Sequence, residues 1–215
     1  MAAEIKREIQ TSDGVDLLCA FIKNSGIAVI RDQLEYLREH GIPFRVITST
    51  YCGATDIQAI NRLVDEFGAE VKVGYESRDT RLHAKAWLFK RNSGFDTAYI
   101  GSSNLSNSAL IDGVEWNVRA SRVSTPEILA KFEAVFETYW NDKHYSIYTP
   151  QHDHDRLAGA LARERRGGAD SSAIELSGLE VRPWPFQLAM LEALQSERST
   201  HGRHRNLLIA ATGTG

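Results

Sequence analysis

The residues of this chain that are best suited to chemistry lie in short blocks between positions 83 and 115. His83 and Lys85 form the first block, Gly101–Asn104 forms the second, and Glu115 follows alone. An imidazole titrates near working pH, so it can attack phosphorus or give a proton to a leaving oxygen. An ammonium and an amide can bind the non-bridging oxygens of a phosphate, and a carboxylate can orient the imidazole. These residue types would support phosphodiester chemistry without a metal ion.

The first block requires a strand to bring its two polar side chains together. Alternation along a strand over 80–89 would direct His83 and Lys85 to one face. The apolar residues between and beside them would then pack behind that face: Leu82, Ala84 and Ala86. We therefore expect an imidazole and an ammonium to share one small surface.

The other two blocks lie at the ends of further predicted strands. The β-prone run 97–100 leads directly into Gly101–Asn104, which places Asn104 just past a strand end, where loops present functional groups. Ser102 and Ser103 become secondary hydrogen-bond donors. A third strand over 114–118 would direct Glu115 and Asn117 to one face.

Taken in order, these blocks resemble the signature of the phospholipase D superfamily, over roughly residues 10–140. Its best-known members carry an aspartate at the position where this chain has Lys90. The form with a downstream glutamate resembles the nuclease branch, which includes metal-independent restriction endonucleases. The resemblance implies an α/β fold with a mixed sheet flanked by helices. It also implies a hydrolase whose site is formed by His83, Lys85, Asn104 and Glu115, with Ser102 and Ser103.

The resemblance also implies an assembly and a mechanism. The superfamily mechanism uses two histidines, whereas this chain has a single His-x-Lys block, so a homodimer would supply the second copy. One His83 would form a phosphohistidine and the other would protonate the leaving oxygen. We expect a nucleic-acid substrate, DNA in particular, and neither a metal ion nor a cofactor.

Each block alone has an ordinary structural explanation. A His-x-Lys pair occurs on many strands, Gly-Ser-Ser-Asn can be a simple turn, and a single glutamate can be a solvated strand residue. The alternative is therefore a non-catalytic module that binds nucleic acid or dimerises. A phospholipid hydrolase is a third hypothesis, which the lack of an exposed apolar stretch for acyl chains disfavours.

Composition limits these alternatives only in part. The chain has 215 residues, a formal net charge of −3, 42% hydrophobic and 25% charged residues, which is ordinary for a globular protein. A nucleic-acid surface must therefore be local. Basic residues dominate 78–91, either as such a patch or as charges on an edge strand: Arg78, Arg81, Lys85, Lys90 and Arg91.

The cysteines, histidines and N-terminus suggest no other kind of site. Cys19 lies in an apolar run and is expected to be buried, while Cys52 lies in a turn-like stretch. His152 and His154 are interpreted as surface residues rather than metal ligands. The charged start and the lack of a long apolar run predict a cytoplasmic protein without a membrane contact.

Alternating strand and helix patterns predict the α/β class. Strands are expected over 15–22, 44–48 and 71–75, and helices over 26–40, 55–67, 105–111, 125–140 and 157–166. Helical spacing puts Ile27, Ile30 and Leu34 on one apolar face, Gly41 and Gly68 are expected to end the first two helices, and Pro126 lies in the first turn of the fourth. Thr55 and Asp56 are predicted to cap the second of these helices, after a hydroxyl-rich segment over 48–56. That segment would either bind a phosphate or form an ordinary turn and cap. The aromatic residues of 125–140 are predicted to serve core or dimer packing rather than a base-stacking surface.

The pattern divides the chain into a phospholipase D-like domain over 1–150, a charged helix and linker over 151–178, and a last segment over 179–215. The linker is expected over 167–173. The last segment ends in 206–215, an apolar run followed by Thr-Gly-Thr-Gly, and resembles the start of a superfamily 2 helicase motor. The sequence ends at Gly215, before the position at which the lysine of a phosphate-binding loop would follow. ATP binding is therefore expected only in a longer protein. A helicase partner in cis would fit a restriction or phage-defence role.

Overall fold

The computed structural model describes residues 1–75, 82, 84–112 and 116–170. These residues belong to one compact unit, Met1–Asp170, and the segment 171–215 with its helicase-like motif lies outside the described part. The elements follow in chain order: α1 (Ala2–Ile9), β1 (Gly14–Leu18), α2 (Asn24–Val29), α3 (Arg31–Glu39), β2 (Phe44–Ser49), η1 (Tyr51–Gly53), α4 (Ile57–Asp65), β3 (Glu70–Gly74), β4 (Ala86–Lys90), β5 (Thr97–Gly101), η2 (Ser108–Asp112), β6 (Asn117–Ser121), α5 (Pro126–Trp140), β7 (Tyr145–Ile147) and α6 (Pro150–Asp170).

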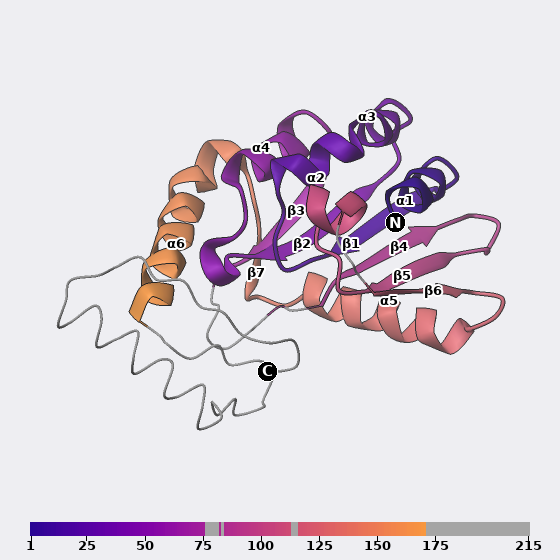
Figure 1. Ribbon diagram of the computed structural model, residues 1–215. Coiled ribbons are helices and arrows are strands. Elements are labelled where there is room, and N and C mark those ends of the chain that lie inside the picture. Colours follow the sequence, from indigo (N-terminus) through magenta and orange to yellow (C-terminus); the bar gives the residue numbers. More distant parts are fainter. Residues whose placement is uncertain (76–81, 83, 113–115, 171–215) are drawn as a thin grey trace, which may run out of the picture. The chain divides into compact units, whose positions relative to one another are not determined.

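The strands form a mixed sheet of seven, in the order β6-β5-β4-β1-β2-β3-β7. β1, β2 and β3 are parallel, whereas β4, β5, β6 and β7 run antiparallel to their neighbours. In Figure 1 α1 to α4 lie over one face and α5 over the other. The expected α/β class, a mixed sheet flanked by helices, is therefore confirmed.

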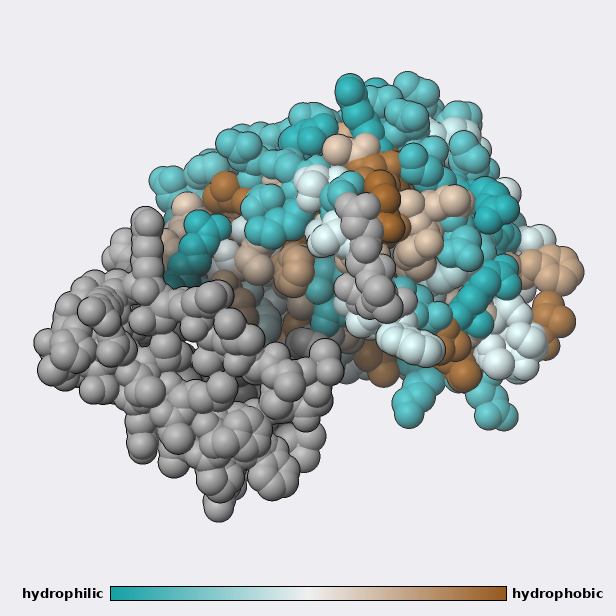
Figure 2. Space-filling view, in the orientation of Figure 1, coloured by the Kyte–Doolittle hydropathy of each residue, from teal (hydrophilic) through white to brown (hydrophobic). Residues whose placement is uncertain are grey.

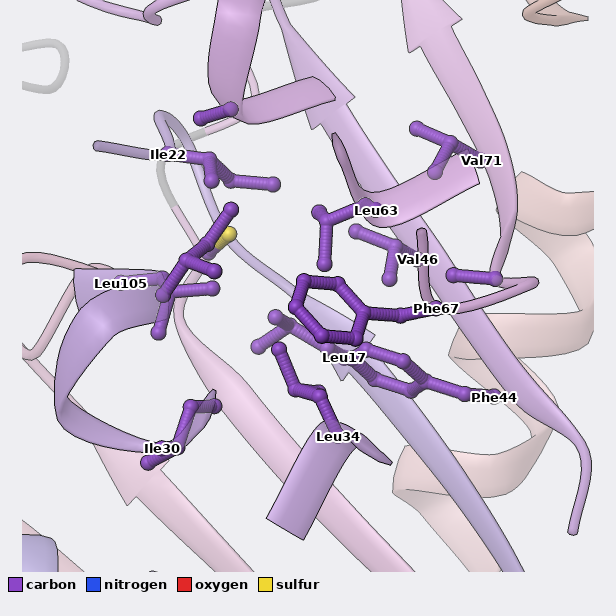
Figure 3. Close-up of a cluster of buried hydrophobic side chains, with 14 of the residues drawn as sticks. Leu17, Ile22, Ile30, Leu34, Phe44, Val46, Leu63, Phe67, Val71 and Leu105 are labelled. Atoms are coloured by element: carbon purple, nitrogen blue, oxygen red, sulfur yellow. The ribbon is translucent and has the colours of Figure 1, made fainter. Parts of the chain in front are cut away.

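Each face of the sheet has its own apolar core. Alternate residues of the strands, such as Leu17 and Val46, pack under α1, α3 and α4, and α6 adds Leu157 to the same cluster. Figure 3 shows part of this core, in which Leu105 from the loop after β5 lies beside Ile22. The residues of opposite parity pack against Leu129, Phe132 and Phe136 of α5 on the other face. The aromatic core predicted for this helix is confirmed at Phe132 and Phe136.

Several predicted elements are shorter or broken. The predicted strand 15–22 ends at Leu18. Beyond it the N–H of Cys19 still donates to the carbonyl of Ile47 of β2 at 3.0 Å, and Ile22 forms an isolated bridge with Leu105. The predicted helix 26–40 is two helices that meet at Ile30. Ile27 and Ile30 are nevertheless fully buried, so the helical spacing identified the apolar face correctly.

The predicted cap of α4 is wrong in its chemistry. Asp56 is the N-cap residue but makes no side-chain cap hydrogen bond. Its carboxylate instead accepts from the backbone N–H of Asn24 and from Nζ of Lys23, at 3.1 and 3.2 Å. Long-range partners therefore replaced the local cap, and Asp56 ties α4 to the start of α2.

The last described helix is longer than expected. α6 spans Pro150–Asp170 instead of 157–166, so the first residues of the predicted linker, 167–170, are helical. Leu157, Ala160 and Leu161 are buried, which packs α6 onto the same unit as the sheet. His152 and His154 of this helix are exposed, as predicted.

The buried carboxylate of Glu8 connects α1 to the sheet. Glu8 accepts hydrogen bonds from Thr97 and Arg119, at 2.7 and 3.0 Å, and pairs with Arg91. Burial acts to raise the pKa of Glu8, but the hydrogen bonds from Thr97, Arg91 and Arg119 outweigh it, so the pKa is lowered. The carboxylate therefore stays charged in the folded protein.

The surface carries no sign of a membrane span. None of the helices among the described residues is both long and apolar enough to cross a bilayer. The face in Figure 2 is mostly hydrophilic, with separate apolar areas between the polar ones.

Candidate active site

Strand directions bring the described members of the chemical blocks, Lys85 and Gly101–Asn104, to one end of the sheet. The start of β4, the end of β5 and the start of β6 are neighbours because β5 runs antiparallel to both β4 and β6. The carboxyl ends of the parallel strands β1, β2 and β3 lie at the same end, since Leu18 of β1 pairs with Ala86 of β4. This is where open α/β sheets commonly bind ligands.

Lys85 is held at this end of the sheet, just before β4. Its backbone carbonyl accepts from the N–H of Gly101 at 3.0 Å, and the residue is only 8% exposed. The side chain lies near the buried thiol of Cys19. Burial raises the pKa of that thiol to about 12, and the Lys85 ammonium is among the groups that oppose the increase. A cation is thus kept partly out of water beside β1.

The strand predicted around Lys85 is wrong at its start. β4 begins at Ala86, so Leu82, Ala84 and Lys85 precede the strand. The β1–β4 ladder ends there because β1 itself ends at Leu18, the partner of Ala86. Leu82 and Ala86 are buried as expected, but Ala84 is exposed. His83 lies outside the described residues.

The first half of the Gly101–Asn104 loop is fixed by Trp116, the residue directly before β6. The N–H of Ser102 donates to the carbonyl of Trp116 at 3.0 Å, and Oγ of Ser102 accepts from the N–H of Trp116 at 3.1 Å. A Cβ at Gly101 would lie 2.0 Å from the same carbonyl, so glycine permits this close approach. The Ser102 hydroxyl therefore positions the loop in this structure.

The second half of the loop is fixed by the apolar core. Leu105 is fully buried, bridges to Ile22 and accepts from the N–H of Lys23 at 2.9 Å. Asn104, 9% exposed, accepts through Oδ1 from the N–H of Phe21 at 3.3 Å. The carbonyl end of its amide is thereby turned to the backbone, which leaves the NH2 end to act as a donor.

The strand predicted over 114–118 begins later than expected. β6 spans Asn117–Ser121 rather than 114–118, and Glu115 lies outside the described residues. Nδ2 of Asn117 donates to Oγ of Ser103 at 2.7 Å. Sequence reasoning placed Asn117 on the face of Glu115 but gave it no role, although the shared parity was a usable signal.

The predicted helix after Asn104 is also displaced. The helical turn is η2, Ser108–Asp112, instead of 105–111. Leu105 cannot begin a helix because it is drawn into the core beside Ile22. The N–H of Ser106 bonds back to the carbonyl of Asn104 at 2.9 Å, which closes a turn at this position.

The hydroxyl-rich segment after β2 proves to be structural. Ser49 and Thr55 donate to backbone carbonyls of Ala20 and Ser49, each at 3.1 Å, and both are buried. Thr50 lies 3.5 Å from the carbonyl of Gly74. Of the two readings, the ordinary turn is the one that these contacts support. As predicted, Cys19 is buried, and Cys52 lies in the turn η1.

The basic residues predicted to form one patch do not do so where the structure describes them. Lys90 and Arg91 lie at the far end of β4 from Lys85. At the rise of a β-strand, the Cα atoms of Lys85 and Lys90 are about 16 Å apart. Lys90 pairs with Asp16 at 2.6 Å, and Arg91 pairs with Glu8. The edge-strand alternative is also wrong because β4 lies inside the sheet. Arg78 and Arg81 lie outside the described residues.

A separate hollow of about 350 Å³ lies at the opposite end of β1. Its charged side chains include Asp16, Arg45 and Lys90, which already form ion pairs with one another. Among the described residues no three His, Cys, Asp or Glu side chains cluster as metal ligands would.

The likeness to one solved structure agrees with this architecture. The chain is similar in structure to phosphatidylserine synthase from Haemophilus influenzae, with a TM-score of 0.51 and 12% identity over 77% of this chain and 42% of the synthase. It also matches NucT from Helicobacter pylori, with a TM-score of 0.46 and 16% identity over 63% of this chain and 84% of NucT. The chain spans less than half of the synthase. At such identities the likeness to the synthase shows the fold alone.

Sequence comparison is more decisive. No curated protein matches the chain. The family model described as the cardiolipin synthase, phospholipase D-like domain matches residues 5–140, which is more than half of the 215 residues. This match covers Lys85 and Gly101–Asn104, which the structure brings to one end of the sheet, and the chain belongs to the phospholipase D-like family.

Proposed function

We propose that this protein is a metal-independent phosphodiesterase, specifically a nuclease that acts on DNA. The observation that carries the proposal is the convergence of Lys85 with the Gly101–Asn104 loop at one end of the sheet. Ser103 and Asn104 are buried in the loop that begins at Gly101, whose N–H bonds to the backbone of the buried Lys85, so a hydroxyl, an amide and an ammonium are available at one end of the sheet to bind a phosphate group. Members of this family are phosphodiesterases or transferases, so the reaction class follows from the family.

The proposed reaction has two balanced steps. In the first, the neutral His83 imidazole of one copy attacks phosphorus, a P–N bond forms and the P–O bond to the leaving group breaks. The leaving oxygen takes its proton from the protonated His83 of a second copy. In the second step that imidazole removes a proton from water, which attacks phosphorus and releases His83. Lys85 and Asn104 bind the non-bridging oxygens throughout, and Glu115 orients each imidazole.

The proposal needs a homodimer because the chain carries one His-x-Lys block. An exposed apolar surface next to the site supports such an assembly. Trp116 is 83% exposed and Val118 is 67% exposed, at the edge strand β6 of the sheet. Ile128 and Val135 of the adjoining α5 are exposed as well. Apolar side chains in this number near one edge are typical of a surface that is covered by a partner.

The choice of DNA and the cellular role rest on the sequence. The glutamate variant of the motif resembles restriction nucleases, and 206–215 resembles the start of a helicase motor. We propose that the domain is the nuclease part of a restriction or phage-defence protein with a helicase in cis. ATP would then be used by that motor.

A chelator experiment tests the proposal. The protein is incubated with single- and double-stranded DNA and RNA in EDTA, together with a His83→Ala variant. We expect cleavage of DNA to persist in EDTA and to disappear in the variant, and a covalent phosphohistidine adduct to be trapped only with wild type. Cleavage that requires added Mg²⁺ would refute the mechanism. Salt-sensitive binding without any adduct or cleavage would favour a non-catalytic binding module instead.

A further inference from the structure

A side-chain pair links the loop after β5 to the first residue of β6. Nδ2 of Asn117 donates to Oγ of Ser103 at 2.7 Å, and Ser103 is 3% exposed. Asn117 is the register partner of Gly101, and Gly101 donates its N–H to the carbonyl of Lys85 at 3.0 Å. Asn117 at the start of β6, Gly101 at the end of β5 and Lys85, directly before β4, thus lie side by side at one end of the sheet.

The direction of this hydrogen bond determines what Ser103 can do. A serine hydroxyl has one hydrogen to donate and two lone pairs to accept with, whereas the NH2 group of asparagine only donates. Because Oγ of Ser103 accepts from Asn117, this bond leaves the hydroxyl hydrogen unused. None of the described residues accepts that hydrogen at hydrogen-bond distance. A recessed hydroxyl whose oxygen is fixed and whose hydrogen is unused is suited to an anion.

We propose that Asn117 is a positioning residue that holds Oγ of Ser103 so that its hydrogen is donated to a non-bridging oxygen of the bound phosphate. This inference rests on the proposed function. It gives Ser103 a direct contact with the reacting group and gives Asn117 a role through Ser103. A fixed donor needs no reorientation as charge develops on the phosphate, so its contribution falls on kcat more than on KM.

A purely structural role for Asn117 is the competing explanation. The side chain also ties β6 to the loop, and its removal could loosen that junction without any effect through the Ser103 hydroxyl. The two explanations differ in a double-mutant cycle. If Asn117 acts through Ser103, its substitution does not lower kcat further once the Ser103 hydroxyl is gone. If Asn117 acts structurally, the two reductions of kcat multiply.

The test uses the full chain with Ser103→Ala, Asn117→Ala and the double variant, assayed for phosphodiester cleavage and thermal unfolding. We expect kcat to fall by about 10²-fold in Ser103→Ala and by about tenfold in Asn117→Ala, with KM nearly unchanged. The double variant should match Ser103→Ala. Effects that multiply in the double variant would overturn the inference.

An isosteric variant guards against loss of folding. In Asn117→Asp the carboxylate accepts the Ser103 hydrogen, so kcat should fall at least as far as in Ser103→Ala while the unfolding temperature stays near wild type. The matched control is Asn141→Asp, because Asn141 also donates through Nδ2, to Glu137 of α5, but lies on the exposed end of that helix. Wild-type activity in Asn117→Asp would refute the inference, whereas an inactive wild type would refute the proposed function.

Discussion

Gly101→Ala is expected to disrupt the junction that builds the site. The added Cβ would lie 2.0 Å from the carbonyl oxygen of Trp116 and 2.5 Å from Oδ1 of Asn117. Real Cβ atoms do not approach backbone oxygens this closely, so β5 and β6 must separate at this point. That separation would break the Ser102–Trp116 hydrogen bonds, which measure 3.0 and 3.1 Å.

The cost can be worked from these contacts. Overpacking of this kind costs about 1–3 kcal/mol, and each lost hydrogen bond adds about 1 kcal/mol. Replacing glycine returns about 0.4–1 kcal/mol by restricting the unfolded chain. The net expectation is a loss of about 2–4 kcal/mol in the free energy of unfolding.

Gly14→Ala is the matched control for the same substitution in the same sheet. A Cβ at Gly14 would lie 3.8 Å from the nearest atoms of Lys90, which is ordinary van der Waals contact. This variant should therefore gain about 0.4–1 kcal/mol. Urea unfolding measures both variants. Equal stability of Gly101→Ala and Gly14→Ala would refute the claim that β5 and β6 are locked together at this position.

Three further predictions concern charge and assembly. Asp16→Asn should lower the free energy of unfolding in urea by about 3–5 kcal/mol, because Asp16 is buried and its removal leaves Arg45 without its bidentate partner. The control Glu35→Gln removes one partner of an exposed ion pair and should change the free energy of unfolding by less than about 1 kcal/mol. The pKa of Glu8 is lowered in the folded state, so its stabilisation is complete well above the unfolded value of about 4.3 and is lost as pH falls through and below it. Glu8→Gln should make unfolding less dependent on pH in that acidic range, and an unchanged pH profile would contradict this. Val118→Glu should convert a dimer into monomers in sedimentation and abolish cleavage with it, because a charge would replace an exposed apolar side chain on β6.

The sequence predicted well those features that depend on neighbours along the chain. Helical spacing identified Ile27, Ile30 and Leu34 as buried, and the Pro126 start of α5 was found directly. Gly41 and Gly68 follow helices with positive φ angles, as helix-ending glycines do. Prediction from the sequence failed where a residue distant along the chain became the partner, as when Asp56 bonded to Asn24 instead of capping its own helix.

The basic stretch shows the same limit. Five basic residues in 78–91 suggested one surface, but Lys85 and Lys90 lie at opposite ends of β4. A strand separates residues that are near in sequence, whereas register brings distant ones together. Charge counted along a window therefore cannot reveal which charges share a surface.

What the sequence alone determined is the order of the chemical blocks, the α/β class and the family, because motif spacing and hydrophobic period are local properties of the chain. Only the tertiary structure decided that Lys85 is buried beside Cys19 and that Asn117 holds Ser103. These contacts depend on which strands pair and in what register. Pairing across the sheet is fixed by the packing of both faces at once, and no single segment of the sequence contains that information.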